Sequence, residues 1–209
     1  MKIADLTTPN PFKQFSDTYS LVYNDKFEEE AHQVVRGLTL STHRKDRHYT
    51  LGNVNGHDII LLERVVDFHK PGREKISLKW AIMHTRLQII NNLPHIFLDG
   101  SNRYHEDIYE EIFTKFSKLV LASKPHQAPF MDAYRIFCNP ETIPLLPALL
   151  PIEITNRLSP LGHEFDYEVI DNRIYVYAPM SVKSTKDIDK MFWALKTLSE
   201  WFESVPGDG

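Results

Sequence analysis

Ten histidines among 209 residues raise the question of a metal site or an acid–base site in this chain. The densest groupings of imidazole and carboxylate are His57-Asp58 and the segment that contains His163, Glu164 and Asp166. Imidazole nitrogens and carboxylate oxygens are common zinc ligands, and a zinc-bound water is a nucleophile for hydrolysis. One hypothesis is therefore a metal-assisted hydrolase that uses these residues, provided that folding brings the two groups together.

The spacing of the remaining residues does not favour catalysis. The sequence contains no HExxH motif, no histidine pair at i, i+4 on a predicted helix, and only one cysteine, Cys138. It also lacks the nucleophile elbow of serine hydrolases and the glycine-rich loops that cradle phosphates. Short groups of histidine and carboxylate are more often solvated strand ends than sites. We therefore assign no catalytic residue and no cofactor, and we favour a protein that is not an enzyme.

The last predicted helix, over 185–204, suggests a binding surface instead. Consecutive residues lie about 100° apart around a helix axis, so one buried face cannot hide all of its aromatic and apolar side chains equally. Aromatic residues and methionine are enriched in the cores of protein interfaces. We predict an interaction site at Met191, Trp193 and Trp201, with another protein or a second copy of the chain, as a homodimer, for its partner.

Composition narrows the other classes of partner. The 24 basic and 28 acidic residues give a net charge of -4, which does not favour nucleic acid. No stretch approaches the roughly 20 apolar residues of a membrane span, and the first residues lack the apolar core of a secretory signal. A lone cysteine fits a reducing compartment. We expect a cytoplasmic protein that does not cross a bilayer.

Among the elements that would position these residues, a β-hairpin is the clearest. Strands are predicted over 48–54 and 57–68, joined by Asn55 and Gly56. These two residues tolerate the positive φ values that a type I′ turn requires. The hairpin is the strongest structural signal in the sequence.

Three further elements of the first half follow from local patterns. Alternating side chains predict a strand over 76–82, and a change of phase predicts a bulge near 83–85. Pro94 favours an edge position for a strand over 93–98, because proline cannot donate to a β-ladder. A helix over 25–35 is predicted before the hairpin.

The rest of the chain alternates helices and strands. The predicted order is a helix over 104–123, a linker over 125–129, a strand over 133–138, a helix over 147–158 that breaks at Pro151, a hairpin over 165–170 and 173–178 that turns at Asp171-Asn172, and a helix over 185–204. This order predicts an α+β fold, with an antiparallel sheet built of hairpins and covered by amphipathic helices. Residues 1–209 are expected to form a single domain, with sub-lobes over 1–124 and 130–209 as a further possibility.

Five stretches of the sequence carry a resemblance to a known family. They are Gly52–Glu63, Asn92–Leu98, Phe130–Phe137, Leu145–Leu158 and Asn172–Tyr177. In their order they resemble an uncharacterised bacterial family of the domain-of-unknown-function type, over about residues 35–205. Members of that family are often tied to a membrane by helices that precede this domain, and no such helices are expected here. The resemblance implies the fold, and it assigns no activity and no site residue.

Overall fold

The computed structural model describes residues 10–26, 44–68, 76–89, 93–100, 118–123, 126, 128–162, 164–179, 182 and 184–204. Within these ranges nine strands form one antiparallel sheet in the order β1-β2-β3-β4-β9-β8-β5-β7-β6. The strands are β1 (Val22–Lys26), β2 (Arg44–Val54), β3 (His57–Phe68), β4 (Ile76–Arg86), β5 (Ile96–Gly100), β6 (Val120–Leu121), β7 (Tyr134–Cys138), β8 (Asp166–Ile170) and β9 (Arg173–Pro179). Strands from both predicted sub-lobes belong to this one sheet.

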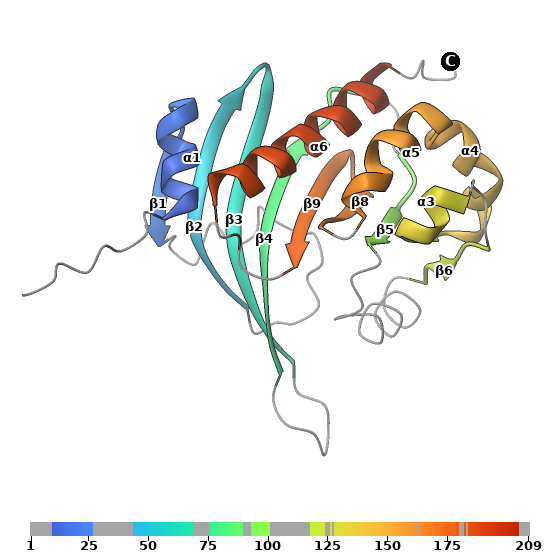
Figure 1. Ribbon diagram of the computed structural model, residues 1–209, viewed down its shortest axis with the longest axis horizontal. Helices are drawn as coiled ribbons and strands as arrows, with labels where there is room; N and C mark the ends of the chain where they lie inside the picture. Colours follow the sequence, from blue (N-terminus) through green and yellow to red (C-terminus); the bar gives the residue numbers. More distant parts are fainter. Residues whose placement is uncertain are drawn as a thin grey trace, which may run out of the picture.

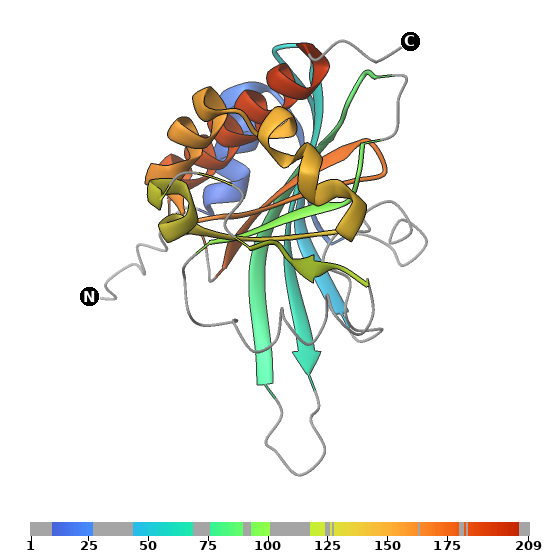
Figure 2. The same ribbon diagram turned by 90° about the vertical axis from the view of Figure 1, so that its right-hand side faces the viewer.

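The helices of the described residues lie on one side of the sheet. They are α1 (Pro11–Tyr19), α3 (Ala128–Ala133), α4 (Leu146–Leu149), α5 (Ile152–Leu158) and α6 (Thr185–Ser204), with the short 3₁₀ helices η3 (Pro140–Leu145) and η4 (Ser159–Leu161). In Figure 1, α6 crosses in front of the central strands, between α1 and α5. Figure 2 shows the helices gathered on one side of the strands. The prediction of an α+β fold with helices covering an antiparallel sheet is confirmed.

Both predicted hairpins are present, and their turns have the expected backbone. Asn55 and Gly56 have φ values of 51° and 90° between β2 and β3. Asp171 and Asn172 have φ values of 51° and 54° between β8 and β9. Positive φ at both central positions matches the right-handed twist of the flanking strands. The local chemistry of these turns therefore sets the register of both strand pairs.

The predicted bulge near 83–85 is wrong. β4 pairs continuously with β3 on one side and with β9 on the other, through Thr85. The side chains of Trp80 and Met83 are both fully buried, on opposite faces of the strand. In a central strand with apolar side chains on both faces, apolar and polar residues do not alternate regularly. The sequence pattern of such a strand therefore resembles the phase change that a bulge would cause. The register shift lies instead in β2, between Arg47 and Thr50.

The predicted edge position of the strand over 93–98 is also wrong. β5 begins at Ile96 and lies between β8 and β7. Pro94 precedes the strand, so its missing N–H costs no ladder hydrogen bond there. Within the described residues the edges are formed by β1 and β6.

Three other predictions concern segments that the structure describes only in part. The helix over 25–35 is wrong at its start, because Asp25 and Lys26 belong to β1, and its remainder lies outside the described residues. The helix over 104–123 is wrong at its end, where Val120 and Leu121 form β6, and residues 104–117 lie outside the described residues. The predicted linker over 125–129 overlaps the start of α3.

The other predicted elements of the second half are confirmed. β7, β8, β9 and α6 lie where the sequence places them. The helix expected over 147–158 is two short helices, as the position of Pro151 indicates. Pro147 lies in the first turn of α4, and Pro151 is the residue before α5. Proline is tolerated at these starting positions because the first N–H groups of a helix have no intrahelical partner.

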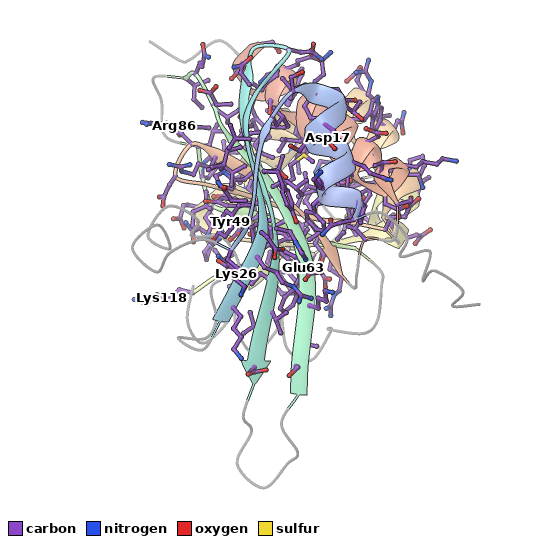
Figure 3. All side chains as sticks on the ribbon, turned by 90° about the vertical axis from the view of Figure 1, so that its left-hand side faces the viewer. Asp17, Lys26, Tyr49, Glu63, Arg86 and Lys118 are labelled. Atoms are coloured by element: carbon purple, nitrogen blue, oxygen red, sulfur yellow. The ribbon has the colours of Figure 1, made fainter. Side chains whose placement is uncertain are left out.

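Side chains form a hydrophobic cluster on each face of the sheet, and Figure 3 shows them on both sides, with Asp17 of α1 on one side and Lys118 on the other. The cluster beneath the helices includes Leu61 of β3 and Met191 of α6. The cluster on the opposite face contains Tyr49, Leu62, Val66, Trp80, Ile82, Phe97, Leu119, Phe137, Tyr175 and Tyr177. Both faces of the central strands are therefore buried.

Gly100, the last residue of β5, lies where the backbone of another segment approaches closely. A Cβ atom added there would overlap the carbonyl oxygen of Gly162 and lie 2.8 Å from that of Phe165. Because backbone atoms cannot move aside cheaply, we expect Gly100→Ala to lower the free energy of unfolding by about 1–3 kcal/mol. Urea denaturation measures this change. The exposed Ser123→Ala should stay within about 0.5 kcal/mol of the parent, and equal values for the two variants would contradict the prediction.

Candidate functional site

The helix α6 is buried on most of its circumference. Its buried side chains are Ile188, Met191, Phe192, Ala194, Leu195, Thr197, Leu198, Ser199 and Phe202. Five side chains reach solvent along one line of the helix, and we call Lys186, Asp189, Trp193, Lys196 and Glu200 the α6 stripe. They recur every three or four residues and fall within an arc of about 80°, at about 100° per residue. Lys190, with a side chain as exposed as that of Lys196, lies beside this line and pairs with Glu164. The α6 stripe is thus the outer line of a helix otherwise embedded in the fold.

The three residues of the predicted interaction site have different environments. Trp193 is 47% exposed at the centre of the α6 stripe. Met191 is fully buried in the cluster beneath the helix. Trp201 is half-buried and donates its Nε1–H to the carbonyl oxygen of Leu149, 2.8 Å away. Of the three, only Trp193 is exposed, whereas Trp201 connects α6 to α4 and Met191 belongs to the core.

Contacts on both flanks hold α6 in this orientation. On one flank the Tyr19 hydroxyl of α1 donates to Asp189 Oδ1 over 3.3 Å. On the other flank Lys190 Nζ donates to Glu164 Oε1 and Oε2 over 2.9 and 2.6 Å. Figure 1 shows α6 with α1, which supplies the first of these contacts, on one side. The rotation that turns the Trp193 indole outward is therefore fixed by neighbours on two sides.

The first half of the predicted metal site lies next to the β2–β3 turn. His57 is partly exposed and Asp58 is exposed at the start of β3. Asp58 Oδ1 accepts a hydrogen bond from Asn53 Nδ2 over 2.9 Å. In the same turn, Asn53 Oδ1 accepts from the N–H of Gly56 over 3.0 Å. These contacts serve the geometry of the hairpin.

The second half of the predicted metal site lies on another strand. Asp166 of β8 is buried, and its Oδ1 accepts from the N–H of Gly100 over 2.8 Å. β4 and β9 lie between β3 and β8, which separates the two strands by roughly 14 Å at about 4.8 Å per strand. The register places Asp58 level with Ile170, not with Asp166, so the two carboxylates are further apart than that. Zinc binds nitrogen and oxygen ligands at about 2 Å, so these two carboxylates do not share one ion. His163 lies outside the described residues.

The described part of the chain contains no group of three or more histidine, cysteine or acidic side chains that could hold a metal ion. Buried carboxylates other than that of Asp166 are paired with cations or hydroxyls in this part of the chain. On β2 and β3, Arg64 Nε and Nη2 donate to Asp46 Oδ1 and Oδ2 over 2.8 and 2.7 Å. Both side chains are almost completely inaccessible, at 1% and 0% exposure. Tyr49 Oη donates to the same carboxylate over 3.2 Å.

This buried pair was not predicted from the sequence. The signal that could have revealed it is Arg64, a lone cation within the apolar strand β3. Asp46 and Arg64 are direct neighbours across the β2–β3 ladder, so the register of the hairpin already places the two charges side by side.

A second buried carboxylate, Glu168 of β8, is held in a similar way. His95 Nε2 lies 2.7 Å from Glu168 Oε1, and the Tyr177 hydroxyl donates to Glu168 Oε2. Arg135 of β7 donates from Nε to Asp99 Oδ2 over 2.8 Å on the neighbouring strand pair. These contacts satisfy the charges of a sheet that is buried on both faces.

His84 of β4 is the most strongly perturbed histidine among the described residues. It is 1% exposed, its ring packs 4.9 Å from that of Tyr175, and neither ring nitrogen has a hydrogen-bond partner within the described structure. Burial, with added repulsion from Arg173 and Arg64, lowers its pKa to about 3. The ring is therefore neutral at physiological pH and cannot serve as a general acid there.

A cavity of about 530 Å³ lies beside α3 and the ends of β6 and β7. Its polar lining includes His126, Asp132 and Arg135. Burial lowers the pKa of His126, whose ring meets that of Phe130 edge to face at 5.5 Å. The volume is that of a small-molecule pocket, but these side chains form no pair of nucleophile and base.

Comparisons with known proteins define the fold and leave the family open. No protein-family model matches the chain, and no curated protein matches it. A solved structure, the crystal structure of the mycobacterial trehalose monomycolate transport factor A, TtfA, is similar to it with a TM-score of 0.62. The match covers 95% of this chain and 96% of that chain at 8% sequence identity. Such a similarity shows a shared fold alone. None of the described helices has both the length and the hydropathy of a membrane span.

Proposed function

We propose that the chain is a protein-binding module that acts through the α6 stripe and catalyses no reaction. The observation that carries the proposal is the 47% exposure of Trp193 on a helix whose other aromatic and aliphatic side chains are mostly buried. Tryptophan is among the residues most enriched at the energetic centres of interfaces, and charged side chains commonly form their rim. The α6 stripe has this composition, with Trp193 at its centre and charges on both sides.

The environments of the other candidate residues support the same choice. Asp58 supports a turn, Asp166 supports the end of β5, and Glu164 pairs with Lys190. Each of these carboxylates has a structural contact that accounts for it. No arrangement of the described residues therefore supports the hypothesis of a metal-assisted hydrolase.

Replacing Trp193 tests the proposal. We expect Trp193→Ala to weaken the capture of a binding partner from a lysate of the source cells by about 30-fold, equivalent to about 2 kcal/mol. The matched control is Leu145→Ala, which removes a 53% exposed apolar side chain from η3. Quantitative pull-down with each immobilised variant measures the effect. Equal capture by the parent, Trp193→Ala and Leu145→Ala would contradict the proposal.

A further inference from the structure

We infer that the partner of the α6 stripe is the α6 stripe of a second copy of the chain, packed antiparallel about a two-fold axis that passes beside Trp193. The inference rests on the proposed function, because it assigns a partner to the same surface. The observation behind it is the order of charges along the helix. When a second copy of the helix runs in the opposite direction, positive side chains of one copy face negative side chains of the other.

The charges of the α6 stripe alternate in sign around the central indole. From the amino end they are Lys186, Asp189, then Lys196 and Glu200 beyond Trp193. In an antiparallel pair, a residue n positions before Trp193 faces the residue n positions after it in the other copy. Lys186 then faces Glu200 of the second copy, and Asp189 faces Lys196. A two-fold axis repeats both attractions, so four opposite-charge contacts flank the two indoles.

The axial spacing of the charges matches this arrangement. Lys186 and Glu200 each lie seven residues from Trp193, or about 10.5 Å along the axis at 1.5 Å per residue. Asp189 lies four residues away and Lys196 three, a mismatch of about 1.5 Å that a flexible lysine side chain spans. A parallel pair would instead place each charge opposite its own copy. The antiparallel arrangement is thus favoured by charge and by position.

Contacts within one copy do not prevent this pairing. Lys196 Nζ lies 3.5 Å from Glu200 Oε1, with the side chains 38% and 57% exposed. Exposed pairs of this kind at i, i+4 contribute only about 0.3–0.5 kcal/mol. The two side chains can therefore turn to a second copy at little cost, and Asp189 keeps a second oxygen beyond the one that Tyr19 contacts.

The size of the α6 stripe sets the expected strength. A helix of this length spans about 30 Å, and a strip about 10 Å wide along it covers roughly 300 Å². Stable interfaces bury about 800 Å² per partner, so the pairing is expected to be weak and dependent on concentration. Flanking side chains of α1 and α5 can add area at the margins of the interface. A dimer that forms at high protein concentration and dissociates on dilution is the expected behaviour.

Charge reversal with mixing tests the inference by sedimentation velocity of the full chain over a wide concentration range. Asp189→Lys alone and Lys196→Glu alone each place like charges opposite one another, and each should weaken the dimer at least tenfold. An equimolar mixture of the two variants restores both attractions and should restore the dimer. The double variant Asp189→Lys/Lys196→Glu should also dimerise by itself. Tyr19→Phe removes the hydroxyl that contacts Asp189 and keeps every charge, so it should retain the parental dimer.

Three results would overturn the inference. One is a parent chain that stays monomeric at every concentration, and another is a dimer that single charge reversals leave unchanged, as a parallel pair or a different surface would give. The third is a mixture that remains monomeric although each reversal alone disrupts the dimer. Failure of the self-pairing is distinguishable from failure of the proposed function, because a monomeric parent whose capture of another protein still depends on Trp193 retains a protein-binding stripe.

Discussion

Arg64→Met is expected to lower the free energy of unfolding by about 3–5 kcal/mol, an effect that urea denaturation at neutral pH measures. Arg64 and Asp46 are 1% and 0% exposed, and two hydrogen bonds of 2.8 and 2.7 Å join them. Removing the guanidinium leaves a buried carboxylate without that cation, while methionine retains much of the side-chain volume. The loss of stability therefore arises mainly from the buried charge of Asp46 without its guanidinium partner, and only in small part from lost packing.

The double variant Asp46→Leu/Arg64→Met separates these contributions. Because it removes both charges, most of the lost stability should return, with a residual cost for the hydroxyl of Tyr49 that donates to Asp46. Lys13→Met is the matched surface control, since Lys13 and Asp17 form an exposed pair at 3.8 Å. That variant should stay within about 0.5 kcal/mol of the parent. A cost below about 1 kcal/mol for Arg64→Met would show that the pair is not essential to the sheet.

His84 should make the protein sensitive to acid. The pKa of its ring is about 3 in the folded chain and about 6.5 in the unfolded chain, so between these values the unfolded chain binds the extra proton. The stabilisation is complete above about pH 6.5 and is lost as the pH falls toward 3. Lowering the pH from 7 to 5 should cost about 2 kcal/mol through this residue alone. Burial of the ring is the main cause, followed by Arg173 and Arg64.

Two variants of different polarity isolate this effect from packing. His84→Leu and His84→Gln both remove the titrating ring, and each should lose about 2 kcal/mol less than the parent between pH 7 and pH 5. Their absolute stabilities should differ, because leucine and glutamine fill the buried site differently. Urea midpoints at the two pH values give the measurement. A parental pH dependence in both variants would show that other groups control the acid response.

Local chemistry in the sequence predicts the hairpins and α6 well. Asn55-Gly56 and Asp171-Asn172 place the turns because few residues tolerate positive φ at low cost. The order of the strands within the sheet has no such local signal. β9 inserts between β4 and β8, and this pairing depends on contacts between segments far apart in sequence. The helix α1 was missed, although Asn10 caps it and Pro11 begins it, because it is short and follows further proline.

Part of the candidate site could be predicted from the sequence. Met191 is in phase with Ile188, Leu195 and Leu198, which share the buried side of the helix. The positions in phase with Trp193 carry charges, so the periodicity alone could have selected it as the exposed member. The half-buried state of Trp201 depends on its hydrogen bond to α4, which periodicity does not reveal. For the metal hypothesis, the separation of Asp58 from Asp166 follows only from the strand order.

The insertion of β9 beside β4 delays completion of the sheet during biosynthesis. β4 ends at Arg86, whereas β9 begins only at Arg173, so the ribosome must add more than 80 further residues before the two strands can pair. Until then β4, which is apolar on both faces around Trp80, has one edge without its final neighbour. Unpaired apolar edges of this kind favour aggregation of nascent chains. Newly made protein should therefore depend on chaperone protection in this interval, and refolding in vitro should be slow and favoured by dilution.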